Sequence, residues 1–196
     1  SREKNVVKVE RYMIRSNDEN YNKEIFNFRG QVQMANMINN ISDSQDRNRF
    51  ICKKIIEEIN KNEKRQILIL SDRKNQLEFL YKNITENTDI SCGYYIGGLK
   101  KNVLKENEKC RILLGTYPMA STGLDIPTLN GLILATPRSD IVQSIGRIDR
   151  VVHENIEPII IDMCDQFSIF ENQCRKRFTL FKKKKYEIID YGLNLD

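Results

Sequence analysis

Two arginines and a glutamine recur at helical spacing in the stretch QSIGRIDR, residues 143–150. On an α-helix, Gln143, Arg147 and Arg150 fall within about 60° of one another, because positions i, i+4 and i+7 share a face. Like charges three residues apart repel by about 0.2–0.5 kcal/mol, and Gly146 costs a helix about 1 kcal/mol relative to alanine. We interpret this face as a site for an anion; an ordinary solvated basic face is the alternative.

A second polar stretch, GTYPMASTGLDIP at residues 115–127, precedes the first along the chain. Hydroxyl groups and main-chain N–H groups near a glycine are typical of phosphate and ribose sites, and an aspartate can accept hydrogen bonds from sugar hydroxyls. A polar loop before a proline-bounded turn is the alternative reading of the same residues. The residue types that favour a binding site here are Thr116, Ser121, Thr122, Gly123 and Asp125.

A sheet of parallel strands is the element that must position both stretches. Short runs rich in isoleucine and leucine alternate with helical patterns, which indicates an α/β fold whose sheet is covered by helices on both faces. The carboxyl ends of parallel strands meet at one edge, so the loops that follow them converge there. We expect strands at 66–70, 90–96, 110–116, 131–136 and 158–162, a helix over 71–84, and an N-cap at Ser139 or Asp140 before the arginine helix.

The flanking segments are expected to complete one unit over residues 1–196. Residues 1–62 lead into the core with an edge strand at 6–14, a short helix at 33–41 and an amphipathic helix at 47–62. Residues 63–165 form the core that carries the motifs. Residues 166–196 are expected to hold a terminal helix, at 167–189, that runs into the lysine cluster 182–185. Phe178 and Phe181, at helical spacing, are expected to cover the core; the alternative is that the lysines bind nucleic acid and the two rings stack on bases.

Composition sets broad limits on the class of protein. The 196 residues carry a net charge of +5, and 30% of them are charged, which indicates a mild preference for polyanions. No apolar run reaches the length of a membrane span and no signal peptide is evident, so we expect an intracellular, reducing compartment. The single histidine, His153, lacks neighbouring metal ligands, and we expect reduced core thiols at Cys52, Cys92, Cys110, Cys164 and Cys174.

The two polar stretches together resemble motifs V and VI of the superfamily 2 helicases and translocases, whose sixth motif has the form Q-x-x-G-R-x-x-R. LILSDRKNQLEFL at 68–80 is similar to motif IV of that family, and YYIGG at 94–98 to the strand-and-glycine segment after it. The order and spacing match over about residues 65–165. The flanking stretch 47–73 most resembles helicases of large DNA viruses and their repair-helicase relatives, and a viral source would place the protein in the virion or the host cytoplasm.

The resemblance implies that the chain is the second of two RecA-like domains. In this family the glutamine and arginines of motif VI face ATP, so Arg147 and Arg150 are implied to act as arginine fingers on the γ-phosphate. By their positions in the motifs, Gly123 and Asp125 are implied to contact the ribose side of ATP, and Gln143 is implied to help position the nucleotide. The set implied to track single-stranded or duplex nucleic acid through its phosphates is Ser71, Arg73, Gly97, Gly98 and Thr116.

The chain departs from the complete family pattern at several points. Ser144 stands where motif VI often carries an arginine. Neither a G-x-x-x-x-G-K-[ST] phosphate loop nor a D-E-x-[DH] metal motif occurs in the 196 residues. We therefore expect ATP and Mg²⁺ to be held mainly by an N-terminal RecA-like domain of the same protein, and the isolated chain to be inactive as an ATP hydrolase.

Two other functions fit the same residues. A non-catalytic nucleic-acid binding module could use Arg147 and Arg150 to hold phosphates of a strand instead of ATP. A double-strand translocase would keep ATP hydrolysis without separating strands. Substitution of Arg150 distinguishes the first alternative, and an unwinding assay distinguishes the second.

Overall fold

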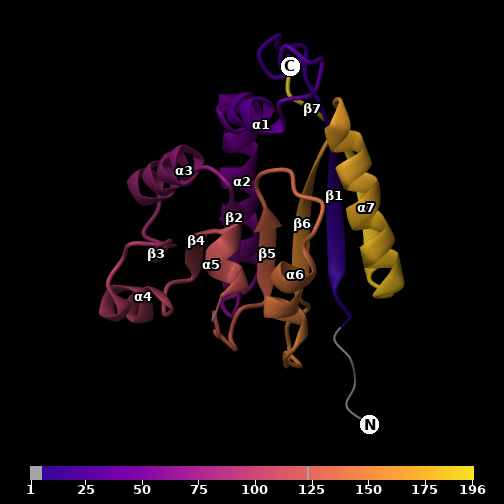
Figure 1. Cartoon of the computed structure of the whole chain (residues 1–196). Helices are drawn as coiled ribbons and strands as arrows, with labels where there is room; N and C mark the ends of the chain where they lie inside the picture. Colours follow the sequence, from indigo (N-terminus) through magenta and orange to yellow (C-terminus); the bar gives the residue numbers. More distant parts are fainter. Residues whose placement is uncertain (1–5, 123) are drawn as a thin grey trace.

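The computed structural model describes residues 6–122 and 124–196 of the chain. In these ranges seven strands form one sheet in the order β3-β4-β2-β5-β6-β1-β7, and every neighbouring pair is parallel (Figure 1). The sheet confirms the expected α/β class. Its strands are β1 (Lys8–Arg15), β2 (Ile67–Ser71), β3 (Cys92–Tyr95), β4 (Ile112–Thr116), β5 (Gly131–Leu134), β6 (Ile159–Asp165) and β7 (Glu187–Asn194).

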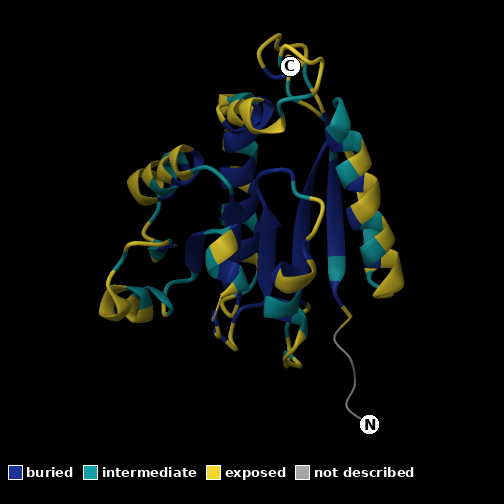
Figure 2. Cartoon of the chain, in the orientation of Figure 1, coloured by how far each residue is buried: buried dark blue, intermediate teal, exposed yellow. Residues whose placement is uncertain are grey.

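Helices cover both faces of the sheet because strand side chains alternate between two apolar clusters. In β2, Ile67 and Ile69 join the cluster under α1, α2 and α3, while Leu68 and Leu70 join the cluster under α5 and α6. Figure 2 shows the central strands buried between helices with exposed outer sides. The helices are α1 (Met34–Ser42), α2 (Gln45–Lys61), α3 (Lys74–Asn87), α4 (Lys101–Asn107), α5 (Tyr117–Ser121), α6 (Val142–Asp149) and α7 (Ile169–Lys183).

The elements expected within the core are present, with shifted ends. The five strands expected between residues 66 and 162 all form, each end within three residues of its predicted position. The N-cap of the arginine helix was predicted wrongly: Ile141 occupies it, without a side-chain cap. Ile141 is buried against the sheet, which fixes where the helix begins, and Asp140 only accepts a hydrogen bond from the N–H of Val142 at 3.3 Å.

Both ends of the chain differ from the prediction. The terminal helix expected to reach residue 189 ends at Lys183, and β7 follows it. Lys185 lies in the left-handed region at φ 58°, which ends the helical path before the strand. Because β7 pairs with β1 in register from Lys8↔Glu187 to Arg15↔Asn194, β1 is an inner strand between β6 and β7, and not the expected edge strand. Phe181 does cover the core, as expected.

The five thiols are free, and burial makes several of them poor nucleophiles. Burial raises the pKa of Cys52 to about 11 and that of Cys92 to about 12. Only the thiolate reacts with iodoacetamide, so at pH 8 we expect Cys52 to be alkylated about two orders of magnitude more slowly than an unperturbed thiol. Mass spectrometry of the native chain measures this rate, with partly exposed Cys110 as the internal control. Equal labelling of Cys52 and Cys110 would contradict the buried position.

No helix in the described ranges is both long and apolar enough to cross a membrane.

Candidate functional site

Helix α6 presents the predicted polar face outward because its other face is anchored in the sheet. Ile145 and Ile148 are fully buried in the cluster that also contains β2 and β5 side chains. Gln143 is exposed, and Arg150 forms the exposed C-cap of the helix. The apolar positions thus decide which way the glutamine and the arginines point.

Arg147 ties α6 to the preceding polar stretch. Its Nε donates to the carbonyl oxygen of Ala120, at 2.5 Å, and its Nη1 donates to that of Leu124, at 2.9 Å. Partial burial and the positive charge of Arg150 both lower the pKa of Arg147, while Asp125 raises it. Arg147, Arg150 and Asp125 are therefore close enough to influence one another's charge. The hydrogen bonds of Arg147 bring the two predicted polar stretches together.

Arg150 is oriented differently from Arg147. Its Nε donates to the carbonyl oxygen of Gly146 within the same helix, at 2.8 Å, and its side chain is exposed. At Gly146 itself, no described atom outside its neighbouring residues and its own helix backbone lies within 4 Å of the position that a Cβ would occupy. Packing within the described chain thus gives no reason for a glycine at this helical position.

A groove of about 330 Å³ runs between the two polar stretches beside α6. Ser121 lies on one side of it, and Gln143 lies on the side of the helix. Asp125 is exposed nearby in the chain, whereas Gly123 lies outside the described residues. The groove is lined by Ser121, Arg138, Asp140, Val142, Gln143 and Ser144.

The residues predicted for nucleic acid lie elsewhere, along the carboxyl ends of three adjacent strands. Ser71 of β2 is in register with Thr116 of β4, and β3, which leads into Gly97 and Gly98, pairs with β4 on the other side. Gly98 has φ 89°, a conformation that glycine adopts without strain. Both glycines are exposed, and no described atom outside the glycines and their chain neighbours lies within 4 Å of either Cβ position. Their main chain is therefore open to a ligand.

Two side chains of this set are engaged inside the protein. The hydroxyl of Ser71 is buried, accepts from the N–H of Arg73 at 2.9 Å and donates to its carbonyl oxygen at 3.1 Å. The guanidinium group of Arg73 donates to Asn39 Oδ1 at 2.5 Å and to the carbonyl oxygen of Ala35 at 2.8 Å. In this structure Ser71 shapes the turn after β2, and Arg73 holds α1 against it.

Sequence reasoning missed an ion pair that links these two regions. Arg138, in the segment before α6, donates from Nη1 to Asp72 Oδ1 at 3.1 Å, and its guanidinium carbon lies 4.7 Å from the ring centroid of Tyr117. Burial raises the pKa of Asp72, while Arg138 and Arg73 lower it. The partners are 66 residues apart, so no local pattern in the sequence could have paired them.

Two buried arginines also hold the segment that leads into α6. Arg47 pairs with Asp165 (Nη2–Oδ2 2.8 Å), and Arg177 pairs with Asp162 (Nε–Oδ1 2.9 Å). Asp162 and Asp165 interrupt an otherwise apolar strand, the one sequence signal that could have indicated buried partners. Both guanidinium groups also donate to main-chain carbonyl groups of the segment before α6, those of Ala135 and Arg138.

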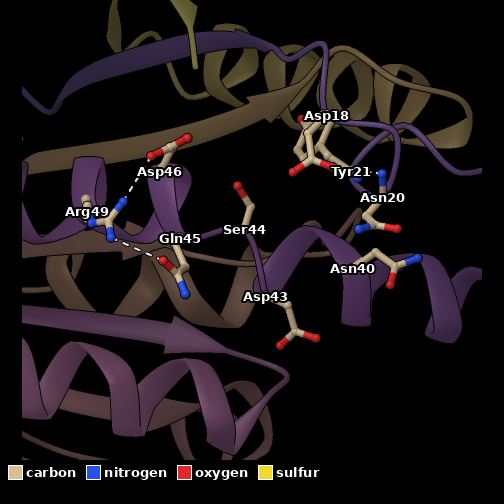
Figure 3. Close-up of a pocket in the computed structure, with 9 residues that line it drawn as sticks. All are labelled: Asp18, Asn20, Tyr21, Asn40, Asp43, Ser44, Gln45, Asp46 and Arg49. Atoms are coloured by element: carbon tan, nitrogen blue, oxygen red, sulfur yellow. Dashed lines mark hydrogen bonds and ion pairs between the residues drawn. The ribbon is translucent and has the colours of Figure 1, made fainter. Parts of the chain in front are cut away.

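A larger hollow, of about 530 Å³, lies away from the predicted residues (Figure 3). Three carboxylates surround it, those of Asp18, Asp43 and Asp46, and Arg49 pairs with Asp46 at 3.1 Å. In the described part of the chain, no group of three or more His, Cys, Asp or Glu side chains is placed to hold a metal ion. None of the predicted site residues lines this hollow.

Comparisons with known proteins identify the family. Residues 51–154 match the family described as "Helicase conserved C-terminal domain". The "Putative ATP-dependent RNA helicase L396" of Acanthamoeba polyphaga mimivirus is 42% identical over 165 residues, which cover 82% of this chain and 31% of that protein. The matched stretch thus spans about a third of this relative.

Solved helicase structures share the fold. The crystal structure of T4 UvsW superposes with a TM-score of 0.74 at 19% identity, over 97% of this chain and 42% of that one. Domain 2 of the DEAD-box helicase Mss116p, bound to an RNA duplex, superposes with a TM-score of 0.55 at 15% identity, over 93% of this chain and 63% of that one. The seven-stranded parallel sheet of the described residues has the RecA-like arrangement of these domains.

Proposed function

Because this chain belongs to the helicase C-terminal domain family of superfamily 2, we propose that it is the second RecA-like domain of an ATP-dependent helicase. In this proposal residues 1–196 form a single domain. One observation carries it: α6 displays Gln143 and Arg150 on one side while Arg147 binds the carbonyl groups of the neighbouring polar stretch. An N-terminal RecA-like domain of the same protein supplies the phosphate loop and the Mg²⁺ site.

The two arginines have different tasks in this proposal. Arg150, which is exposed and donates to a main-chain carbonyl of its own helix, stabilises the charge that develops on the γ-phosphate. Arg147 holds the carbonyl group of Leu124, next to Asp125, and contributes its charge from there. Asp125 and Gly123 bind the ribose side of ATP in this proposal. Gln143, at the groove, positions the nucleotide.

Nucleic acid is bound, in this proposal, along the carboxyl ends of β3, β4 and β2. Gly97 and Gly98, both exposed residues, offer main-chain N–H groups, and Thr116, a partly exposed residue at the end of the adjacent strand, offers a hydroxyl group. Such contacts hold phosphates and do not read bases. Ser71 and Arg73 act as positioning residues for this edge, given their internal hydrogen bonds. Domain 2 of Mss116p, which has a related fold, was solved bound to an RNA duplex, and this supports nucleic acid as the class of ligand.

The alternative of a non-catalytic binding module predicts a different result for one substitution. If Arg150 serves ATP, Arg150→Ala leaves the affinity of the chain for a single-stranded oligonucleotide within about twofold, with an unchanged salt dependence. If Arg150 holds a phosphate of the strand, affinity falls and the slope of log K against log salt decreases by about one. Fluorescence anisotropy of a labelled oligonucleotide at several salt concentrations measures both quantities. A decrease in slope would overturn the assignment of Arg150 to ATP.

A translocase without unwinding shares all of these features. Strand displacement from a partial duplex, measured beside ATP turnover in a protein with both RecA-like domains, separates the two. Turnover without displacement would support the translocase.

A further inference from the structure

An exposed aromatic side chain stands at the tip of a small hairpin before α1. Phe28 is 93% exposed, the highest value among the exposed large hydrophobic residues of the described chain. The hairpin, residues 26–32, is closed by an antiparallel bridge between Phe26 and Val32. Contact between an apolar ring and water is unfavourable, so a binding partner that covers the ring would explain why Phe28 stands at this position.

The tip is held in one conformation by its own hydrogen bonds. Asn27 Oδ1 accepts from the N–H groups of Arg29 at 2.9 Å and Gln31 at 3.0 Å, and the N–H of Asn27 donates to the carbonyl oxygen of Gln31 at 2.8 Å. Gly30 takes the left-handed φ of 75° that the turn requires. The aromatic ring is thus presented on an ordered turn, which lowers the entropic cost of using it for binding.

The chemistry of the tip fits a flat, neutral ligand. The guanidinium carbon of Arg29 lies 5.4 Å from the ring centroid of Phe28, so an aromatic face and a planar cation stand side by side. Both groups stack on nucleic-acid bases, whichever base is present. We propose that Phe28, with Arg29, is a stacking site for a base of single-stranded nucleic acid, an inference that rests on the proposed nucleic-acid function.

The hairpin is connected to the edge of the sheet assigned to nucleic acid. The N–H of Gln33 donates to the carbonyl oxygen of Ile25 at 2.7 Å, which closes the hairpin directly before α1. Arg73, in the turn after β2, holds α1 through Asn39 and Ala35. Figure 1 shows this loop beyond α1 at the end of the molecule where the C-terminus lies. The hairpin and the turn after β2 are thus both joined to α1, and in this proposal a nucleic-acid strand bound at the carboxyl end of β2 continues to the tip.

Nearby carboxylates limit what part of a strand the hairpin can bind. Asp18, Asp43 and Asp46 surround the hollow at the base of the same loop (Figure 3). Their negative charges repel phosphates, so the expected contact at the tip is with a base and not with the backbone. Phe26 is 51% exposed and Met34 is 43% exposed. The alternative to a nucleic-acid base is therefore a protein partner that contacts Phe28, Phe26 and Met34 together.

A fluorescence experiment tests the stacking contact directly. The chain contains no tryptophan, so Phe28→Trp introduces a single reporter at the tip. We expect its emission to be quenched on addition of an oligothymidine or oligouridine, with a midpoint equal to the affinity measured separately by anisotropy. Val6→Trp, at a position 64% exposed before the amino end of β1, is the matched control and is expected to be unaffected.

Affinity measurements with two further variants test the energetic contribution. Phe28→Ala is expected to weaken binding about fivefold or more, because base–aromatic stacking is lost. Phe28→Leu keeps most of the apolar surface without the aromatic face and is expected to behave like alanine. The ratio of affinities to the wild type is expected to stay constant between low and high salt, because stacking releases no counterions.

The outcomes separate this inference from the function on which it rests. If the oligonucleotide binds but Phe28→Trp is not quenched, or if Phe28→Leu binds like the wild type, the stacking site is overturned while the nucleic-acid function stands. If the wild-type chain shows no binding at low salt, both proposals are overturned.

Discussion

Arg150→Ala is expected to lower ATP turnover by a factor of about 10³–10⁵ in a protein that joins this chain to a first RecA-like domain. The exposed guanidinium group at the end of α6 would supply positive charge to the γ-phosphate as the bond to it breaks. Steady-state phosphate release with and without single-stranded nucleic acid measures the effect. Turnover in the variant within tenfold of the wild type would remove Arg150 from the chemistry.

Two further variants make this result specific. Arg49→Ala removes an exposed arginine from α2, 59% exposed and paired only at the surface, and is expected to leave turnover unchanged. Arg147→Ala is expected to raise KM for ATP as well as lowering kcat, because Arg147 also holds the carbonyl groups of Ala120 and Leu124. If both arginine variants lose kcat alone, the distinct role assigned to Arg147 is wrong.

Arg47→Met is expected to lower the free energy of unfolding by about 3–5 kcal/mol, because it leaves the carboxylate of Asp165 buried without its cation. Burial disfavours the charge of Arg47, but Asp165 raises the pKa of Arg47 above its ordinary value. Because the pKa of Arg47 is raised in the folded state, its contribution to stability is present at every pH below that pKa, so we expect no loss from deprotonation of Arg47 up to pH 9. Urea denaturation followed by circular dichroism measures the free energy.

The same helix offers the control for this experiment. Arg49→Met makes the same chemical change two residues away at an exposed position, and is expected to alter stability by less than about 0.5 kcal/mol. The double variant Arg47→Met, Asp165→Leu removes both charges and is expected to be more stable than Arg47→Met alone. Equal losses from Arg47→Met and Arg49→Met would show that the buried pair contributes nothing measurable.

Local periodicity predicted the parts of the fold in which neighbouring residues in sequence carry the information. The apolar positions Ile145 and Ile148 sufficed to orient α6, and the runs of isoleucine and leucine sufficed to find β2, β4 and β5. The prediction for the end of the chain was wrong for the same reason. The lysine run and Ile188–Ile189 read equally well as a helix, and only pairing with β1, about 180 residues earlier, makes them a strand.

The candidate site, too, was predictable from the sequence only in part. The motif residues of α6 and of the polar stretch before it are recognisable because their types and spacing are local. The ion pairs of Asp72 with Arg138 and of Arg177 with Asp162 join separate elements, and their partners are chosen by the folded sheet. Whether Ser71 reaches solvent is also a property of the folded turn, and its buried hydroxyl could not be read from the sequence.

The anchoring of the segment before α6 has a mechanical consequence. Ala135 accepts hydrogen bonds from Arg47 and Gln76, and the carbonyl group of Thr136 accepts one from Tyr117. Local opening of this segment would break contacts to α2, α3 and α5 together, so its free energy approaches that of global unfolding. We therefore expect the arginine helix and this edge of the sheet to move together as one rigid body, so that a displacement of one is transmitted to the other.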